Sequence, residues 1–325
     1  MSCFVDWRDA WQRALYGPEG FYHKGSGPSS HFRTSMASAD LMAGALGELA
    51  RREGLRRVVE VGSGRGELLA ALHTLDPALE LVGTDVVPRP VGLPDAVRWV
   101  VSGGGAAIAG DLVAELRDAL VVAHEWLDDV PCTVCERDGD GAWRVVEVAA
   151  DGRERLATPA SGADLAWLER WWTTGDPAAP GDRAEVGAAR DDAWAALVGA
   201  SSGCLLVAVD YDHARGSRPP QGTLIGYRDG AVCAPVPDAG CDLTAHVALD
   251  AVAAAGEVAG ASGTRLARQR EVLRELGVSG ALPGIAGAST DPGAYVVALA
   301  AATRGAELLD PSGLGDFGWL LQRSP

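Results

Sequence analysis

Residues 58–69 constrain the fold of this chain more than any other segment. A run of β-branched residues ends at Glu60 and Val61, three glycines (Gly62, Gly64 and Gly66) then alternate with other residues, and a Leu/Ala-rich stretch follows. This order predicts a strand, a tight turn and a helix, the first unit of a nucleotide-binding sheet. Glycine adopts unusual dihedral angles and lets the backbone approach a ligand closely. A glycine turn without a ligand is the alternative.

The spacing of the glycines separates this turn from the dinucleotide-binding fingerprint. That fingerprint is G-x-G-x-x-G, whereas the chain carries G-x-G-x-G preceded by an acid. The pattern resembles the E/D-x-G-x-G-x-G motif of class I S-adenosylmethionine (SAM) methyltransferases. The resemblance implies SAM as the cofactor. It places the methionine end and the adenosine of SAM at Glu60, Gly62, Ser63, Gly64 and Gly66.

A second predicted strand supports this interpretation. Residues 79–85 form a short apolar run that ends in Asp85, about twenty residues beyond the last glycine. An acid in this position can accept hydrogen bonds from ribose hydroxyls. Pro88 and Pro90 follow, as expected where a strand has ended. An ordinary turn residue is the alternative for Asp85, but beside the glycine motif we favour the ribose.

Composition narrows the class of protein. The chain has 325 residues, 47% of them hydrophobic and 22% charged, which is typical of a globular protein. No apolar run approaches membrane-spanning length, so we expect a cytoplasmic protein without a membrane partner. The net charge of −16 disfavours a nucleic-acid partner. Cys132 and Cys135 form a C-x-x-C without a second pair, so we expect no metal site. The oligomeric state is left open.

Strands and helices alternate along the chain, which predicts an α/β fold with a doubly wound, mostly parallel sheet. We expect a single domain over residues 1–325, with an N-terminal helical cap at 1–56 and a substrate-side insertion at 132–203 that contains a hairpin and a helix. The segments expected beyond the glycine turn include strands at 97–101, 119–123, 204–209 and 317–321, a hairpin at 132–148, a loop at 175–187, and helices at 106–117, 245–255, 266–276 and 294–309.

Acidic residues follow the predicted fourth strand, residues 119–123. In a doubly wound sheet this strand lies beside the first one, so its carboxyl end faces the ligand crevice. Helix capping would explain Asp128 and Asp129. It explains Glu125 less well, because this residue stands at the strand terminus. Carboxylates in this position could hold a guanidinium group in bidentate fashion.

Several blocks of the chain together resemble the MidA-type methyltransferases. The family pattern after the fourth strand is N-E-F-F-D-x-L-P, and here it reads H-E-W-L-D-D-V-P, with His124 in the place of Asn. The block D-L-T-A-H-V is intact. The further blocks follow in the family's order, so the resemblance covers nearly the whole chain: residues 209–212, 222–227, 242–247 and 308–317.

Mitochondrial members of this family methylate an arginine of a respiratory complex I subunit, so the resemblance implies a protein arginine or a similar nitrogen as the acceptor. It implies that Glu125, Asp128 and His246 orient that acceptor. A helix-capping segment with a structural histidine is the alternative for His246. The family's F-x-T-A-P-E block is altered at residues 32–37. A small-molecule N- or O-methyltransferase and a non-catalytic SAM-binding protein therefore remain open.

Overall fold

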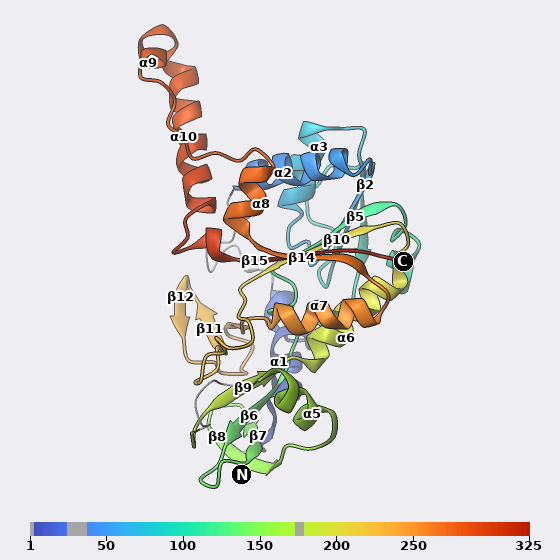
Figure 1. The fold of residues 1–325 in the computed structure, drawn as a ribbon, viewed down its shortest axis with the longest axis vertical. Helices are drawn as coiled ribbons and strands as arrows, with labels where there is room; N and C mark the ends of the chain where they lie inside the picture. The colour runs from blue at the N-terminus through green and yellow to red at the C-terminus, as the bar shows by residue number, and fades with distance from the viewer. Residues whose placement is uncertain (1–2, 25–37, 173–178) are drawn as a thin grey trace.

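A seven-stranded sheet forms the centre of the protein in a computed structural model that describes residues 3–24, 38–172 and 179–325 (Figure 1). Five neighbouring strands are parallel, and β15 runs antiparallel to both of its neighbours. The predicted doubly wound, mostly parallel sheet is confirmed. The strand order is β14 (Ser262–Arg268), β15 (Gly318–Arg323), β10 (Leu205–Asp210), β5 (Ala119–His124), β2 (Arg57–Val61), β3 (Glu80–Asp85) and β4 (Val97–Val101).

Helices cover both faces of this sheet because alternate strand residues point to opposite sides. Val58 and Leu120 pack with one set of helices, whereas Val59 and Val121 pack with the other. Figure 1 shows the first set above the sheet and the second set below it. The upper helices are α2 (Ala39–Arg52), α3 (Glu67–Leu75) and α8 (Gln269–Glu275), and the lower ones are α6 (Ala188–Ala200) and α7 (Leu249–Val258).

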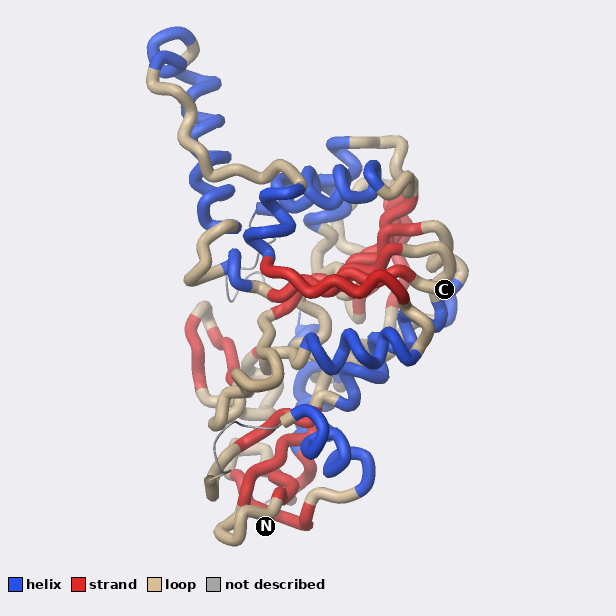
Figure 2. Tube along the Cα trace, viewed as in Figure 1, coloured by secondary structure: helices blue, strands red, loops and turns tan. Residues whose placement is uncertain are grey.

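A second sheet lies below the main one (Figure 2). The predicted hairpin is confirmed, since β6 and β7 pair antiparallel with Arg137 opposite Trp143. The loop expected at 175–187 is wrong in part, because its described end forms β9 and pairs with β6. Residues 173–178 lie outside the described residues. The strands are β1 (Val5–Asp6), β6 (Thr133–Arg137), β7 (Trp143–Val148), β8 (Glu154–Pro159) and β9 (Arg183–Val186), and α5 (Gly162–Trp171) packs beside β9.

The two N-terminal helices contribute to different parts of the molecule. Helix α1 (Trp7–Tyr16) packs on the second sheet, where Trp7 and Trp11 are fully buried. Helix α2 packs on α3 and the main sheet instead. A short 3-10 turn, η1 (Phe21–Lys24), follows α1 and brings Tyr22 towards the main sheet's crevice.

A three-stranded sheet joins these parts, with β11 (Ile225–Arg228) between β12 (Ala231–Cys233) and β13 (Asp242–Thr244). Helix α7 begins only at Leu249, so the prediction of a helix from residue 245 is wrong at its start. His246 lies in the loop before α7. The helix expected at 266–276 is also shorter, because residues up to Arg268 form β14. The helix expected at 106–117 is reduced to α4 (Gly110–Val113).

The sheet reverses its winding direction at β2. The chain proceeds from β2 to β3 and β4 on one side, and β5 then pairs with the other side of β2. Open α/β sheets bind ligands at the carboxyl ends of their strands at such a point. The ends of β2, β3 and β5 therefore define where a site is expected.

Candidate active site

The turn after β2 is held in shape by the neighbouring strand. The N–H groups of Gly62 and Ser63 both donate to the carbonyl of Thr84, each at 3.0 Å. Ser63 Oγ donates to the carbonyl of Glu60 and accepts from the N–H of Thr84. The three glycines have φ values of +73°, +54° and +74°, in the region that side chains rarely adopt. The sequence therefore places glycine where the turn needs it.

Gly64 and Gly66 face different surroundings. A Cβ on Gly64 would meet only the carboxylate of Glu67, at 3.9 Å, so open space lies beside this backbone. A Cβ on Gly66 would come within 2.7 Å of Leu93 Cδ1 instead. Gly64 leaves room for a ligand, whereas Gly66 opens α3 and packs against the protein itself.

Two buried acids flank the turn. Glu60 is 3% exposed, and its Oε2 has no hydrogen-bond partner among the described residues. Burial raises the pKa of Glu60 well above its usual value. Asp85 Oδ2 accepts from the N–H of Gly64 at 2.8 Å, and burial also raises the pKa of Asp85. The end of β3 is thereby tied to the middle of the turn.

A cavity of about 490 Å³ opens at these strand ends. Its size lies within the usual range for small-molecule and cofactor sites. Apolar walls come from Val86, Ile108 and Leu112. Of the residues selected from the sequence, the lining includes Glu60, Gly62, Ser63, Gly64, Asp85, Glu125 and Asp128, but it includes neither Gly66 nor His246.

Glu125 stands at the end of β5 in a strained conformation. Its φ is +49°, and its N–H donates to the carbonyl of Val209 at 2.8 Å. A left-handed conformation costs a residue with a side chain about 1–2 kcal/mol. Such strain persists where the surrounding structure fixes it, and it is common at functional sites. The neighbouring ring of His124 places Nδ1 3.4 Å from Glu125 Oε1.

Four aspartates lie together beside the cavity. Asp128 Oδ2 accepts from Thr244 Oγ1 at 2.8 Å, and Asp210, fully buried, lies against Asp128. Burial and the charge of Asp128 raise the pKa of Asp210 well above its usual value. Asp129 and Asp242 both accept from the hydroxyl of Tyr22, with burial raising both pKa values, that of Asp242 to about 7.

Arg190 fixes the loop that carries these acids. This guanidinium, 1% exposed, donates to the carbonyls of Asp128 at 2.6 Å and Val130 at 3.2 Å. It also donates to the carbonyls of Ala245 at 3.0 Å and His246 at 2.7 Å. The loop after β5 is thus joined to the loop after β13 by one buried cation.

His246 is not among the residues that line the cavity. Its N–H donates to Thr223 Oγ1 at 2.9 Å, and its ring stacks on Tyr211 with the ring centroids 5.6 Å apart. Burial lowers the pKa of His246. The D-L-T-A-H-V block contributes Asp242, which accepts from Tyr22, and Thr244, which donates to Asp128; sequence reasoning selected neither residue.

Comparison with known proteins decides the family. A family model described as "Putative S-adenosyl-L-methionine-dependent methyltransferase" matches residues 91–266, more than half of the chain. The chain belongs to this family. The assignment to MidA-type SAM-dependent methyltransferases is confirmed, and SAM is the cofactor.

Solved structures of other proteins have the same fold as this methyltransferase. A COG1565 superfamily member from Burkholderia thailandensis, bound to S-adenosyl-homocysteine, is 22% identical over 98% of this chain and 88% of its own, with a TM-score of 0.75. A native structure of a COG1565 superfamily protein from the same organism matches over 99% of this chain and 87% of its own, with 22% identity and a TM-score of 0.75. No curated protein matches the chain.

Three further findings concern a membrane, a metal ion and the altered family block. In the described residues, no helix is long and apolar enough to cross a membrane. No three His, Cys, Asp or Glu side chains gather there in a way that could hold a metal ion. The altered family block at residues 32–37 lies outside the described residues.

The cavity of this methyltransferase suits the cofactor. The space beside Gly64 and the buried Oε2 of Glu60, which has no partner among the described residues, provide room and a hydrogen-bond acceptor next to the glycine turn. The apolar wall formed by Val86, Ile108 and Leu112 suits a flat ring such as adenine.

His124 provides a test through the pH dependence of stability. Burial lowers its pKa from 6.5 to about 4. Between these pH values the unfolded chain binds a proton on this side chain and the folded chain does not, so His124 makes stability fall as the pH falls. The wild type should lose unfolding free energy when the pH is lowered from 7 to 5. In His124→Asn, which carries the residue of the family pattern, we expect this loss to be smaller by about 1–2 kcal/mol. Urea unfolding at both pH values measures the difference, and parallel losses would contradict it.

Proposed function

We propose that this methyltransferase transfers a methyl group to a nitrogen of a cationic acceptor, with an arginine side chain of a protein as the favoured substrate. The charge of the cavity wall supports the proposal. Six carboxylates line the cavity, and Arg65 is the one Lys or Arg side chain among its described lining residues. A negatively charged cleft concentrates cations and disfavours anionic acceptors. The carboxylates are Glu60, Glu67, Asp85, Glu125, Asp128 and Asp129.

In this proposal one group of acids binds the cofactor and another binds the acceptor. Glu60 and Asp85, with Gly62, Ser63 and Gly64, hold the cofactor, while Gly66 shapes the turn that they need. Glu125 and Asp128, at the end of β5, hold the acceptor. SAM supplies an electrophilic methyl group on a sulfonium centre when it is bound. The protein's contribution is to place the acceptor nitrogen in line with that methyl group and to exclude water.

The raised pKa values of the acids agree with a cationic acceptor. Burial raises the pKa of Asp128, and burial with the neighbouring charge of Asp128 raises the pKa of Asp129 further. Mutual repulsion of carboxylates is relieved when a cation binds between them. A guanidinium can donate hydrogen bonds to two carboxylates at once, which also orients its nitrogen atoms. His246 acts in this proposal as a positioning residue, since its carbonyl binds Arg190.

The same observation favours a second candidate. A protonated carboxyl group donates a hydrogen bond to a neutral oxygen or nitrogen atom, and the raised pKa values of Asp129 and Asp210 favour that form. A neutral small-molecule acceptor therefore remains compatible with the acid cluster.

A labelling experiment separates the two candidates. Cell lysate is incubated with the protein and with SAM that carries a radioactive methyl group, and protein is then separated from small molecules. We expect label in protein, and acid hydrolysis should release it as methylarginine. Once a labelled protein is identified, a peptide that contains its methylated arginine is compared with the same peptide carrying citrulline at that position. The citrulline peptide should accept no methyl group, because citrulline has the same shape without the charge. Label that appears only in small molecules would overturn the arginine assignment.

A further inference from the structure

A helical arm from the C-terminal third of the sequence projects away from the main sheet (Figure 1). We call residues 281–301 the arm; they include α9 (Ala286–Thr290) and the larger part of α10 (Pro292–Leu308). The buried residues of α10 are Ala302, Gly305 and Leu308, all beyond the arm. Figure 2 shows the outer turns of this helix well away from the main sheet and from the second sheet. The body therefore covers only the base of α10.

Large apolar side chains cover the arm. Leu282, Ile285, Val296 and Val297 are 72%, 77%, 63% and 70% exposed. A short helix without tertiary packing is marginally stable in water, and most helical stability comes from a buried face. β-Branched residues such as the paired valines lower helix propensity further. The arm thus has the composition of a helix whose face is covered by a partner.

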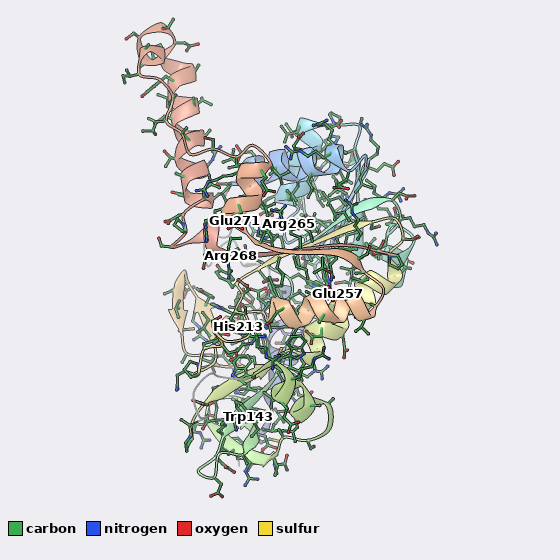
Figure 3. The ribbon with its side chains drawn as sticks, in the orientation of Figure 1. Trp143, His213, Glu257, Arg265, Arg268 and Glu271 are labelled. Carbon is green, nitrogen blue, oxygen red and sulfur yellow. The ribbon has the colours of Figure 1, made fainter. Side chains whose placement is uncertain are left out.

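The lack of charge on the arm bears on which partner covers it. Residues 276–303 contain one charged side chain, Asp291, in a chain with a net charge of −16. Two copies of so acidic a chain repel each other where their acidic surfaces meet, so an uncharged surface is where they approach with least repulsion. Charged residues such as Arg268 and Glu271 lie on β14 and α8, on the body and not on the arm (Figure 3).

Other partners fit less well. A cationic protein would bind the acidic surfaces and not this neutral one. An anionic membrane surface attracts Lys and Arg on an interfacial helix, and residues 276–303 contain neither. We propose that two copies of this chain form a dimer by packing their arms against each other about a two-fold axis. Such an interface uses the same patch on both copies.

The proposed interface is separate from the active site. Among the described residues, none that lines the cavity comes from the arm. Disruption of the dimer should therefore leave SAM affinity unchanged. The inference is independent of the acceptor assigned above.

The test is the mass of the full chain in solution. We expect the wild type to sediment at twice the chain mass of 33.6 kDa and to dissociate on dilution. The double variant Val296→Glu with Val297→Glu should raise the dissociation constant at least about 100-fold, because acids would then face acids across the axis. Both valines are exposed, so the variant should keep the wild-type circular dichroism spectrum and SAM affinity.

A matched control separates position from charge. Val258 ends α7 and is 87% exposed, outside the arm. Val258→Glu should remain dimeric. A wild type that stays monomeric at high concentration would overturn the proposal, as would a dimer that survives the double variant or one that Val258→Glu also dissociates. A monomer that cosediments with phosphatidylcholine vesicles would assign the arm to a membrane surface instead.

Discussion

Glu125→Gln should lose methyl-transfer activity by roughly 30- to 1,000-fold while SAM affinity changes by less than about threefold. A preorganised charge contact contributes about 2–4 kcal/mol to transition-state stabilisation, which corresponds to this loss of kcat/KM. Glutamine keeps the shape of the side chain and removes its charge. The strained backbone at φ +49° is the same for both residues, so the variant should fold. Initial rates with a labelled acceptor and calorimetry with SAM measure the two effects.

The control for this change removes a carboxylate elsewhere. Glu169 is exposed on α5, outside the cavity. Glu169→Gln alters the net charge by the same amount and should leave the rate unchanged. If Glu125→Gln lost SAM affinity in step with activity, Glu125 would belong to the cofactor site. A variant with normal activity would remove the chief support for a cationic acceptor and favour a neutral small molecule.

Local sequence signals predicted the parts of the fold that depend on neighbouring residues. The turn after β2 was predicted because glycine spacing encodes its positive φ angles directly. The hairpin of β6 and β7 was predicted because its turn and its two strands are contiguous. Alternation of strands and helices predicted a doubly wound sheet, in which the strand at 119–123 lies beside the first one, as β5 does beside β2.

Segments that depend on distant partners were predicted less well. Residues 262–268 pair with the C-terminal strand β15, some fifty residues later, and the last three of them lay in the segment 266–276 that was expected to be a helix. β9 consists of four residues that are strand only because β6 lies beside them. A short apolar run does not distinguish strand from helix by its periodicity.

The candidate site shows the same division. Glu125 and Asp128 follow a predicted strand and could be selected from the sequence. Tyr22 and Arg190 could not, because their roles depend on contacts with residues more than fifty positions away. No local pattern marks Arg190. The D-L-T-A-H-V block marked the right segment but suggested His246. In the structure Asp242 belongs to the aspartate cluster itself, and Thr244 donates to Asp128.

Gly64→Leu should reduce SAM affinity by more than about 100-fold, or about 3 kcal/mol of binding free energy. Two effects act together. A side chain at φ +54° strains the turn by about 1–2 kcal/mol. The new Cβ and its methyl groups also occupy the open space beside this backbone, where the nearest protein atom is the carboxylate of Glu67 at 3.9 Å. Titration calorimetry with SAM and with S-adenosylhomocysteine measures the loss.

A second glycine separates strain from the loss of ligand space. Gly54 has a φ of +71° in the turn after α2, nothing lies within 4 Å of its would-be Cβ, and it is not part of the cavity. Gly54→Leu should therefore lower the unfolding free energy by about as much as Gly64→Leu, since both variants carry the left-handed strain. SAM affinity should fall only in Gly64→Leu. Undiminished SAM binding by a folded Gly64→Leu variant would place the cofactor elsewhere, and an equal loss in both variants would mean that strain alone weakens binding.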